Sequence, residues 1–89
     1  MERRQITFRG RVQGVGFRAT ARHVAGGFNV SGWVRNEADG TVFLEIQGPS
    51  GDIDAYLGTL RNRMGRLIAG EDTRTAAVVA GEHGFEVRR

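Results

Sequence analysis

The chain has 89 residues, of which 39% are hydrophobic and 26% charged, and it contains no cysteine. This length predicts a single domain over residues 1–89 with a modest core, and the missing cysteines exclude disulfides, thiolate nucleophiles and cysteine-bound metals. The formal net charge is +3, but arginines and carboxylates are interleaved along the chain, which is typical of a solvated surface rather than of a nucleic-acid-binding stripe.

The first elements expected are a strand and a helix joined by a glycine-rich turn. Apolar and polar side chains alternate over residues 5–12, which is the pattern of a half-buried strand. The turn occupies residues 13–16, and from Phe17 the apolar spacing lengthens to that of a helix. Gly26 and Gly27 are expected to end this helix, with a glycine in the left-handed cap conformation.

A hairpin is expected next. Period-two alternation returns over residues 30–35 and again over residues 42–47, and Asp39-Gly40 supplies the turn chemistry between the two strands. Trp33 and Phe43 fall on the face of these strands that should point away from the helices. On that face they could stack against nucleic-acid bases or simply cover an open sheet.

A second helix and two strands complete the expected fold. Residues 53–64 have helical apolar spacing, with Ser50 or Asp52 as the expected N-cap. Residues 75–80 are expected to form the fourth strand, and residues 85–87 a short closing one. The order predicts an α+β fold of the ferredoxin-like, split βαβ type (βαββαβ), in which an antiparallel sheet carries two helices on one face.

The turn after the first strand has the chemistry of an anion site. Gly14 and Gly16 allow positive φ and a close approach of a ligand to the backbone, and successive amides of such a turn can form a concave anion nest. Arg18 lies near the positive end of the following helix, which disfavours a cation unless an anion is bound there. A plain tight turn followed by a surface arginine explains the same residues equally well.

Asn36 is the second candidate. By period two it shares the face of Val34, which should meet the helices, so its amide needs polar partners or water. It could orient a water towards an anion in the turn. A turn-forming asparagine leading into Asp39-Gly40 is the commoner use of this residue type, and the residues around Asn36 alone favour that interpretation.

Two long motifs, in this order, resemble those of the acylphosphatase family. Gly10–Arg18 reads GRVQGVGFR and Gly32–Gly40 reads GWVRNEADG, and Phe85–Arg88 is similar to the family's closing strand. The resemblance implies a ferredoxin-like fold and hydrolysis of acyl phosphates to a carboxylate and orthophosphate, without metal, cofactor or covalent intermediate. Residues 64–73 match the family poorly, which leaves the bounds of the fourth strand open.

The resemblance also implies the roles of particular residues. The catalytic residues would be Arg18 and Asn36, with Asn36 positioning the attacking water. The residues whose amides or side chain bind the phosphoryl group would be Gln13, Gly14, Val15, Gly16, Phe17 and Arg18.

The expected partner is a small-molecule acyl phosphate, with no nucleic acid and no membrane. A cytoplasmic location is expected, because the sequence shows neither a signal-peptide pattern nor an apolar run of membrane-spanning length. The protein is also expected to be a monomer. The alternative is a non-catalytic phosphate- or RNA-binding module of the same fold. Its RNA-binding form is weakly supported, because the third expected strand has a single aromatic residue, Phe43, followed closely by a carboxylate.

Overall fold

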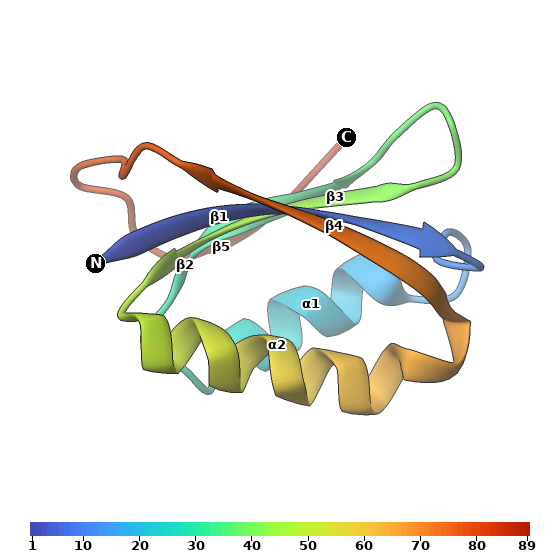
Figure 1. Cartoon of the computed structure of the whole chain (residues 1–89), viewed down its shortest axis with the longest axis horizontal. Coiled ribbons are helices and arrows are strands. Elements are labelled where there is room, and N and C mark those ends of the chain that lie inside the picture. Colours follow the sequence, from blue (N-terminus) through green and yellow to red (C-terminus); the bar gives the residue numbers. More distant parts are fainter.

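The computed structural model describes residues 1–89, and their five strands form one sheet in the order β4-β1-β3-β2-β5. Both helices lie against the same face of this sheet (Figure 1). The elements are β1 (Glu2–Gly10), α1 (Phe17–Ala25), β2 (Ser31–Asn36), β3 (Val42–Gly48), α2 (Ser50–Met64), the short 3₁₀ turn η1 (Gly65–Leu67), β4 (Ile68–Ala76) and β5 (Phe85–Arg88). The predicted ferredoxin-like α+β class is confirmed.

The sheet is mixed, where the sequence predicted an antiparallel one. The pairs β1–β3, β1–β4 and β2–β3 are antiparallel, but β5 runs parallel to β2, with Phe85 opposite Gly32. Because β4 and β5 lie at opposite edges, residues 77–84 must carry the chain across the width of the sheet. The alternation of a short strand shows which face is buried but not the direction in which that strand pairs.

The prediction of a strand at residues 75–80 is wrong. β4 ends at Ala76, and most of its length lies earlier, where the sequence showed no apolar alternation. Edge strand β4 is held by its ladder to β1, and backbone hydrogen bonds need no apolar side chains. Val78 and Val79, which suggested a strand, are instead about half exposed in the connection to β5.

The core lies between the sheet and the two helices. Side chains from alternate positions of the central strands meet the apolar stripes of α1 and α2. The Tyr56 hydroxyl of α2 donates a buried hydrogen bond of 3.0 Å to the Ala21 carbonyl of α1, which joins the helices. The fully buried large side chains are Ile6, Phe8, Val12, Phe17, Val34, Val42, Leu44, Ile46, Ile53, Tyr56 and Leu60.

Two predicted helix caps are wrong. Gly26, at the end of α1, has right-handed φ and ψ of −63° and −16°, because the last turn closes with hydrogen bonds to carbonyls three residues back. Pro49 precedes α2 and no side chain caps it, so neither Ser50 nor Asp52 is the N-cap. Neither helix combines the length and the apolar character needed to cross a bilayer.

Candidate active site

The loop between β1 and α1 is built on glycines with positive φ. Gly14 has φ 74° and Gly16 has φ 80°. A Cβ on either would meet nothing within 4 Å, so it is the backbone conformation, not crowding, that requires glycine here. The residues between and beside these glycines have no positive φ, and such alternation in a turn can direct successive N–H groups towards one side, as in an anion nest.

Helix α1 begins directly after this loop with an open N-terminus. Gly16 is the N-cap residue, no side chain caps it, and no acidic residue lies in the first turn. The first amides of a helix have no intrahelical partner and lie at the positive end of its dipole. The loop and the helix end therefore offer donors to the same anion.

Gln13 fixes the loop to the hairpin of β2 and β3. Its side-chain amide donates to the Glu37 carbonyl at 2.7 Å and to the Thr41 carbonyl at 2.9 Å. Glu37 follows Asn36, the last residue of β2. One side chain thus ties the glycine loop to the neighbourhood of Asn36.

Asn36 holds a buried polar atom that has no hydrogen-bond partner. It pairs with Val42 at the end of β2, and its Oδ1 is buried without any partner in the protein. Such an atom costs about 1–3 kcal/mol if it stays unsatisfied. The observation therefore indicates that a water or a ligand group completes the hydrogen bonding of Asn36.

One cavity of about 790 Å³ brings the predicted residues together. Gly14, Gly16, Phe17, Arg18 and Asn36 all line it. Arg18 has no carboxylate within 4.0 Å, and no carboxylate side chain lines the cavity. An anion in this space would therefore meet arginine side chains and no opposing carboxylate side chain.

Two of the predicted phosphate-binding residues do not line this cavity. The side chain of Gln13 is engaged by the hairpin, and Val15 is 37% exposed at the tip of the loop. Any contribution from these two residues to anion binding would come from their backbone amides. No group of three or more histidine, aspartate or glutamate side chains is placed to hold a metal ion.

Sequence reasoning missed six further residues that line the cavity, namely Val12, Ala19, Arg22, His23, Val87 and Arg89. Arg22 follows Arg18 by four residues in α1, so helical periodicity was a signal that could have found it. Val87 pairs with Val34 in the parallel ladder of β5 and β2. That ladder brings the end of β5 beside the end of β2, which no sequence pattern indicated.

Comparison with known proteins decides the family. The sequence profile of the acylphosphatase family matches residues 4–87. The chain belongs to the acylphosphatase family. An acylphosphatase from Salinibacter ruber is 43% identical over 82 residues, which cover 90% of this chain and 85% of that protein. The predicted family and the predicted enzyme class, a hydrolase of acyl phosphates, are confirmed.

Solved structures of acylphosphatases have the same architecture. The acylphosphatase from Bacillus subtilis superimposes with a TM-score of 0.88 at 26% identity, over 100% of both chains. The chain is also similar to T. kodakarensis HypF, with a TM-score of 0.85 at 25% identity. That match covers 100% of this chain but 12% of HypF.

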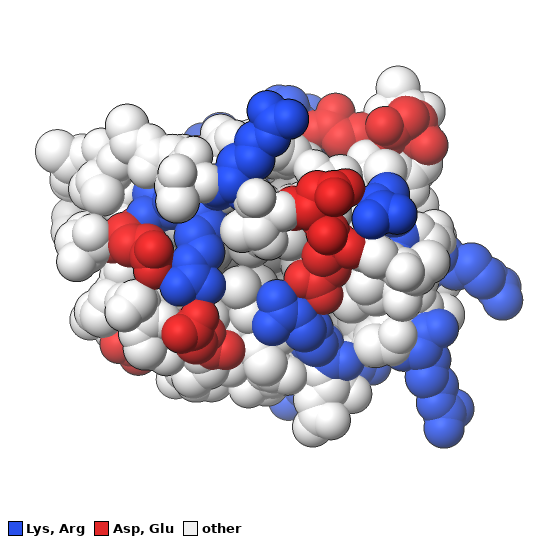
Figure 2. All heavy atoms as spheres, in the orientation of Figure 1, with Lys and Arg blue, Asp and Glu red and all other residues white.

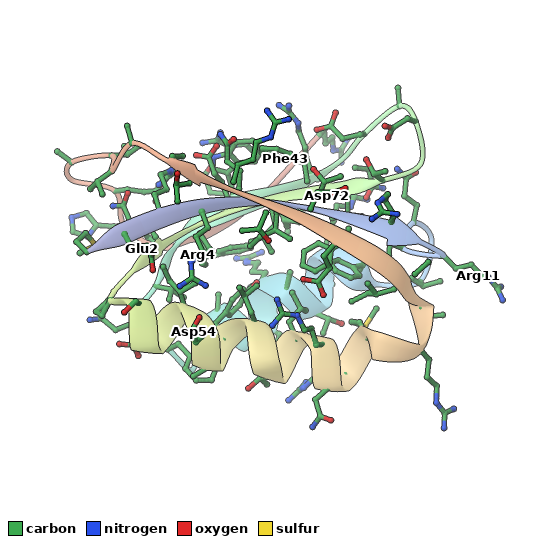
Figure 3. The ribbon with its side chains drawn as sticks, viewed as in Figure 1. Glu2, Arg4, Arg11, Phe43, Asp54 and Asp72 are labelled. Carbon is green, nitrogen blue, oxygen red and sulfur yellow. The ribbon has the colours of Figure 1, made fainter.

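In this acylphosphatase the face of the sheet opposite the helices is covered by its own arginines. Trp33 and Phe43 stack with ring centroids 5.4 Å apart, and Figure 3 shows Phe43 on the side of the sheet away from α1 and α2. The guanidinium of Arg88 lies 4.5 Å from the Trp33 ring, and that of Arg35 lies 5.1 Å from it. Since only 9% of Trp33 is exposed, the aromatic pair covers the sheet and is not an open stacking platform.

The remaining surface charge is mixed. Figure 2 shows basic and acidic side chains next to one another on the face viewed there. Some of them form ion pairs between elements: Arg4 of β1 contacts Asp54 of α2 at 2.8 Å, and the two point towards each other in Figure 3. Arginines outside the cavity, such as Arg11 and Arg74, also lack a carboxylate within 4.0 Å. The cavity differs in being lined by several unpaired arginines together, with no carboxylate side chain among them.

Proposed function

We propose that this acylphosphatase binds the phosphoryl group of an acyl phosphate in its glycine loop and hydrolyses it with a water held by Asn36. The observation that carries the proposal is the buried, unpartnered Oδ1 of Asn36, a residue that lines one cavity with Gly14, Gly16 and Arg18. A side chain with unmet hydrogen-bonding capacity, beside a set of anion-binding donors, suits a water molecule held next to a bound phosphoryl group.

The loop amides and Arg18 hold the phosphoryl group. The left-handed glycines aim backbone N–H groups at it, and the uncapped start of α1 adds further donors. Arg18 presents a planar fork that can donate two parallel hydrogen bonds to phosphate oxygens. Bound phosphate also removes the unfavourable interaction between Arg18 and the helix dipole.

The reaction needs little acid–base assistance from the protein. The oxygen of water forms a bond to phosphorus while the bond from phosphorus to the acyl oxygen breaks, and its electron pair leaves with the carboxylate. The proton lost by the water passes to a phosphoryl oxygen, so the products are a carboxylate and orthophosphate. Such transfer proceeds through a loose transition state that asks mainly for positioning and charge stabilisation, which the loop, Arg18 and Asn36 supply.

The proposal extends to the partners and the location of the protein. We expect residues 1–89 to act as one catalytic domain, as a cytoplasmic monomer, on a small acyl phosphate, with neither metal nor nucleic acid. The arginine-covered aromatic pair supports the absence of a base-stacking site. Light scattering at working concentration, and electrophoretic mobility of single-stranded RNA, would test the monomer and the nucleic-acid claims.

The deciding experiment is hydrolysis of benzoyl phosphate in the presence of EDTA. Wild type should turn over, while Arg18→Ala and Asn36→Ala should each lose about 10²–10³-fold in kcat, the range found when a transition-state donor is removed. Arg11→Ala is the matched control, because Arg11 is exposed near the same loop and projects from the end of the molecule in Figure 3. Asn29→Ala, another exposed position, is the control for Asn36.

Each outcome bears on a named part of the proposal. Undiminished activity in Arg18→Ala would remove the assignment of the phosphate site. Loss of wild-type turnover in EDTA would overturn the metal-free mechanism. Thermal unfolding of every variant, measured alongside, distinguishes a lost catalytic group from a lost fold.

A further inference from the structure

The cavity is longer than a phosphoryl group needs. Arg18 and Arg22 both line it, and four residues of helix separate them by about 6 Å along the axis of α1. Arg22 also lines an adjoining hollow with Phe28 and Phe85. The cavity therefore extends from the glycine loop along α1, in the direction that the acyl part of a bound substrate could take.

The walls beyond the glycine loop are positively charged and unpaired. Arg22 comes from α1 and Arg89 follows the end of β5, and neither has a carboxylate within 4.0 Å. No carboxylate side chain lines the cavity at all. Elsewhere, Arg4, Arg9 and Arg61 form ion pairs with neighbouring carboxylates, and arginines that form none, such as Arg74, do not line this cavity.

The position of Arg22 in α1 favours a positive charge, and Arg22 has no carboxylate partner. It lies in the last turn of α1, where the negative end of the helix dipole stabilises a cation. Arg18, one turn earlier, carries a like charge at the spacing that costs a few tenths of a kcal/mol. The phosphoryl group offsets the charge of Arg18. Arg22 lies a helical turn away from the loop, so its charge would be offset only by a second anion.

We propose that the preferred substrates carry a second anionic group on the acyl part, bound by Arg22 and Arg89. The inference rests on the proposed function, since it takes the phosphoryl group to lie in the glycine loop. A carboxylate or a phosphonate at the far end of the acyl group has the required chemistry, because guanidinium binds both with paired hydrogen bonds. Arg22 and Arg89 then determine specificity and take no part in the chemical step.

The test compares substrates that differ only at the distal position. The probes are benzoyl phosphate, 4-carboxybenzoyl phosphate and 4-phosphonobenzoyl phosphate. Wild type should favour the charged probes, and Arg22→Ala should reduce the ratio of kcat/KM for charged over uncharged probe by about three- to fivefold, the range of a solvent-accessible ion pair. The change should fall mainly on KM, since the contact is the same in ground and transition states, and it should shrink at high salt.

Arg74→Ala is the matched control for loss of one positive charge. Arg74 is exposed in β4, has no carboxylate partner and lies with Gln5 and Phe43 on the opposite face of the sheet. The ratio of kcat/KM for charged over uncharged probe should not change in Arg74→Ala. Arg89→Ala should reduce the ratio as Arg22→Ala does. Equal rates for charged and uncharged probes in wild type, or equal ratios in Arg22→Ala and Arg74→Ala, would overturn the proposal.

A binding experiment separates this inference from the proposed function. Calorimetric titration with benzylphosphonate and 4-carboxybenzylphosphonate needs no turnover. Tighter binding of the carboxylated compound, lost in Arg22→Ala, would support the second anion site even if benzoyl phosphate were not hydrolysed. Turnover of benzoyl phosphate with no preference for either phosphonate would leave the proposed function standing and would contradict this inference.

Discussion

The side-chain amide of Gln13 donates a hydrogen bond of 2.7 Å to the carbonyl of Glu37, the residue directly after Asn36. It donates a second one to the Thr41 carbonyl across the same hairpin. The glycine loop and the end of β2 come from segments more than twenty residues apart in sequence. Gln13 is therefore the side chain that sets the spacing between the glycine loop, the proposed phosphate site, and Asn36, the proposed water-binding residue.

Gln13→Ala should impair catalysis more than folding. Loss of two partly buried hydrogen bonds should cost about 1–2 kcal/mol of unfolding free energy, and kcat on benzoyl phosphate should fall about tenfold or more because the loop is no longer fixed against Asn36. Gln5→Ala is the control, since Gln5 also donates from its side-chain amide, to Glu45. Equal activity in both variants, at similar stability, would show that the Gln13 contacts have no positioning role.

Gly16→Ala should combine a local strain with a loss of phosphate affinity. A left-handed alanine costs about 1–2 kcal/mol, and relief of that strain would rotate the amides of the loop. Gly81→Ala is the control because Gly81 has φ 74° with open space around it, in the connection between β4 and β5. Both variants should lose similar stability, but only Gly16→Ala should weaken competitive inhibition by orthophosphate. Unchanged inhibition would argue against a phosphate site at this loop.

Local sequence patterns predicted the parts of the site that lie within continuous segments. The place of Gly14 and Gly16 between a strand and a helix predicted positive φ for both. Period-two alternation predicted that Asn36 lies on the buried face of its strand. The structure places all three in one cavity with Arg18. The local pattern fits an anion site and a plain tight turn equally well, and it is the family resemblance that favours the anion site.

The residues that were missed depend on pairing between distant segments. Arg89 reaches the cavity because β5 lies parallel to β2, and a short strand carries no signal of its direction. The predicted bounds of β4 were wrong for a related reason. An edge strand is held by backbone hydrogen bonds and its side chains are mostly exposed, so it shows little apolar alternation. The periodicity of a sequence does not show which distant segments pair with each other.

Gly32→Ala should prevent β2 and β3 from pairing. Gly32 has φ 150°, and a Cβ there would overlap the main-chain carbonyl of Glu45 in the neighbouring strand. Because both sides of this overlap are backbone, the cost should be about 3 kcal/mol or more. Gly40→Ala is the matched control in the same hairpin, with φ 92° and no atom near a Cβ. Chemical denaturation should show a much lower midpoint for Gly32→Ala; equal midpoints would contradict the predicted overlap.

Acid should weaken the protein through the ion pair of Arg3 and Glu82. Arg3 is only 2% exposed, and it donates to both carboxylate oxygens of Glu82 at 2.8 and 3.1 Å. These hydrogen bonds lower the pKa of Glu82 from its usual 4.5 against the opposing effect of burial, and Ser31 adds a further donor.

A carboxylate whose pKa is lower in the folded state stabilises the fold above its unfolded pKa, and this contribution is lost as the pH falls through the lower, folded value. The unfolding free energy of wild type should therefore fall as the pH drops below about 4.5, and Glu82→Gln should lower it by about 1 kcal/mol at pH 7 and flatten that acid dependence. Glu86→Gln is the control, because Glu86 forms an exposed pair with Arg88 and should change stability by a few tenths of a kcal/mol. Because Glu82 lies in the connection that leads to β5, its loss should also loosen the strand that carries Val87 to the cavity. An acid dependence identical in wild type and Glu82→Gln would show that the Arg3 pair does not hold this connection.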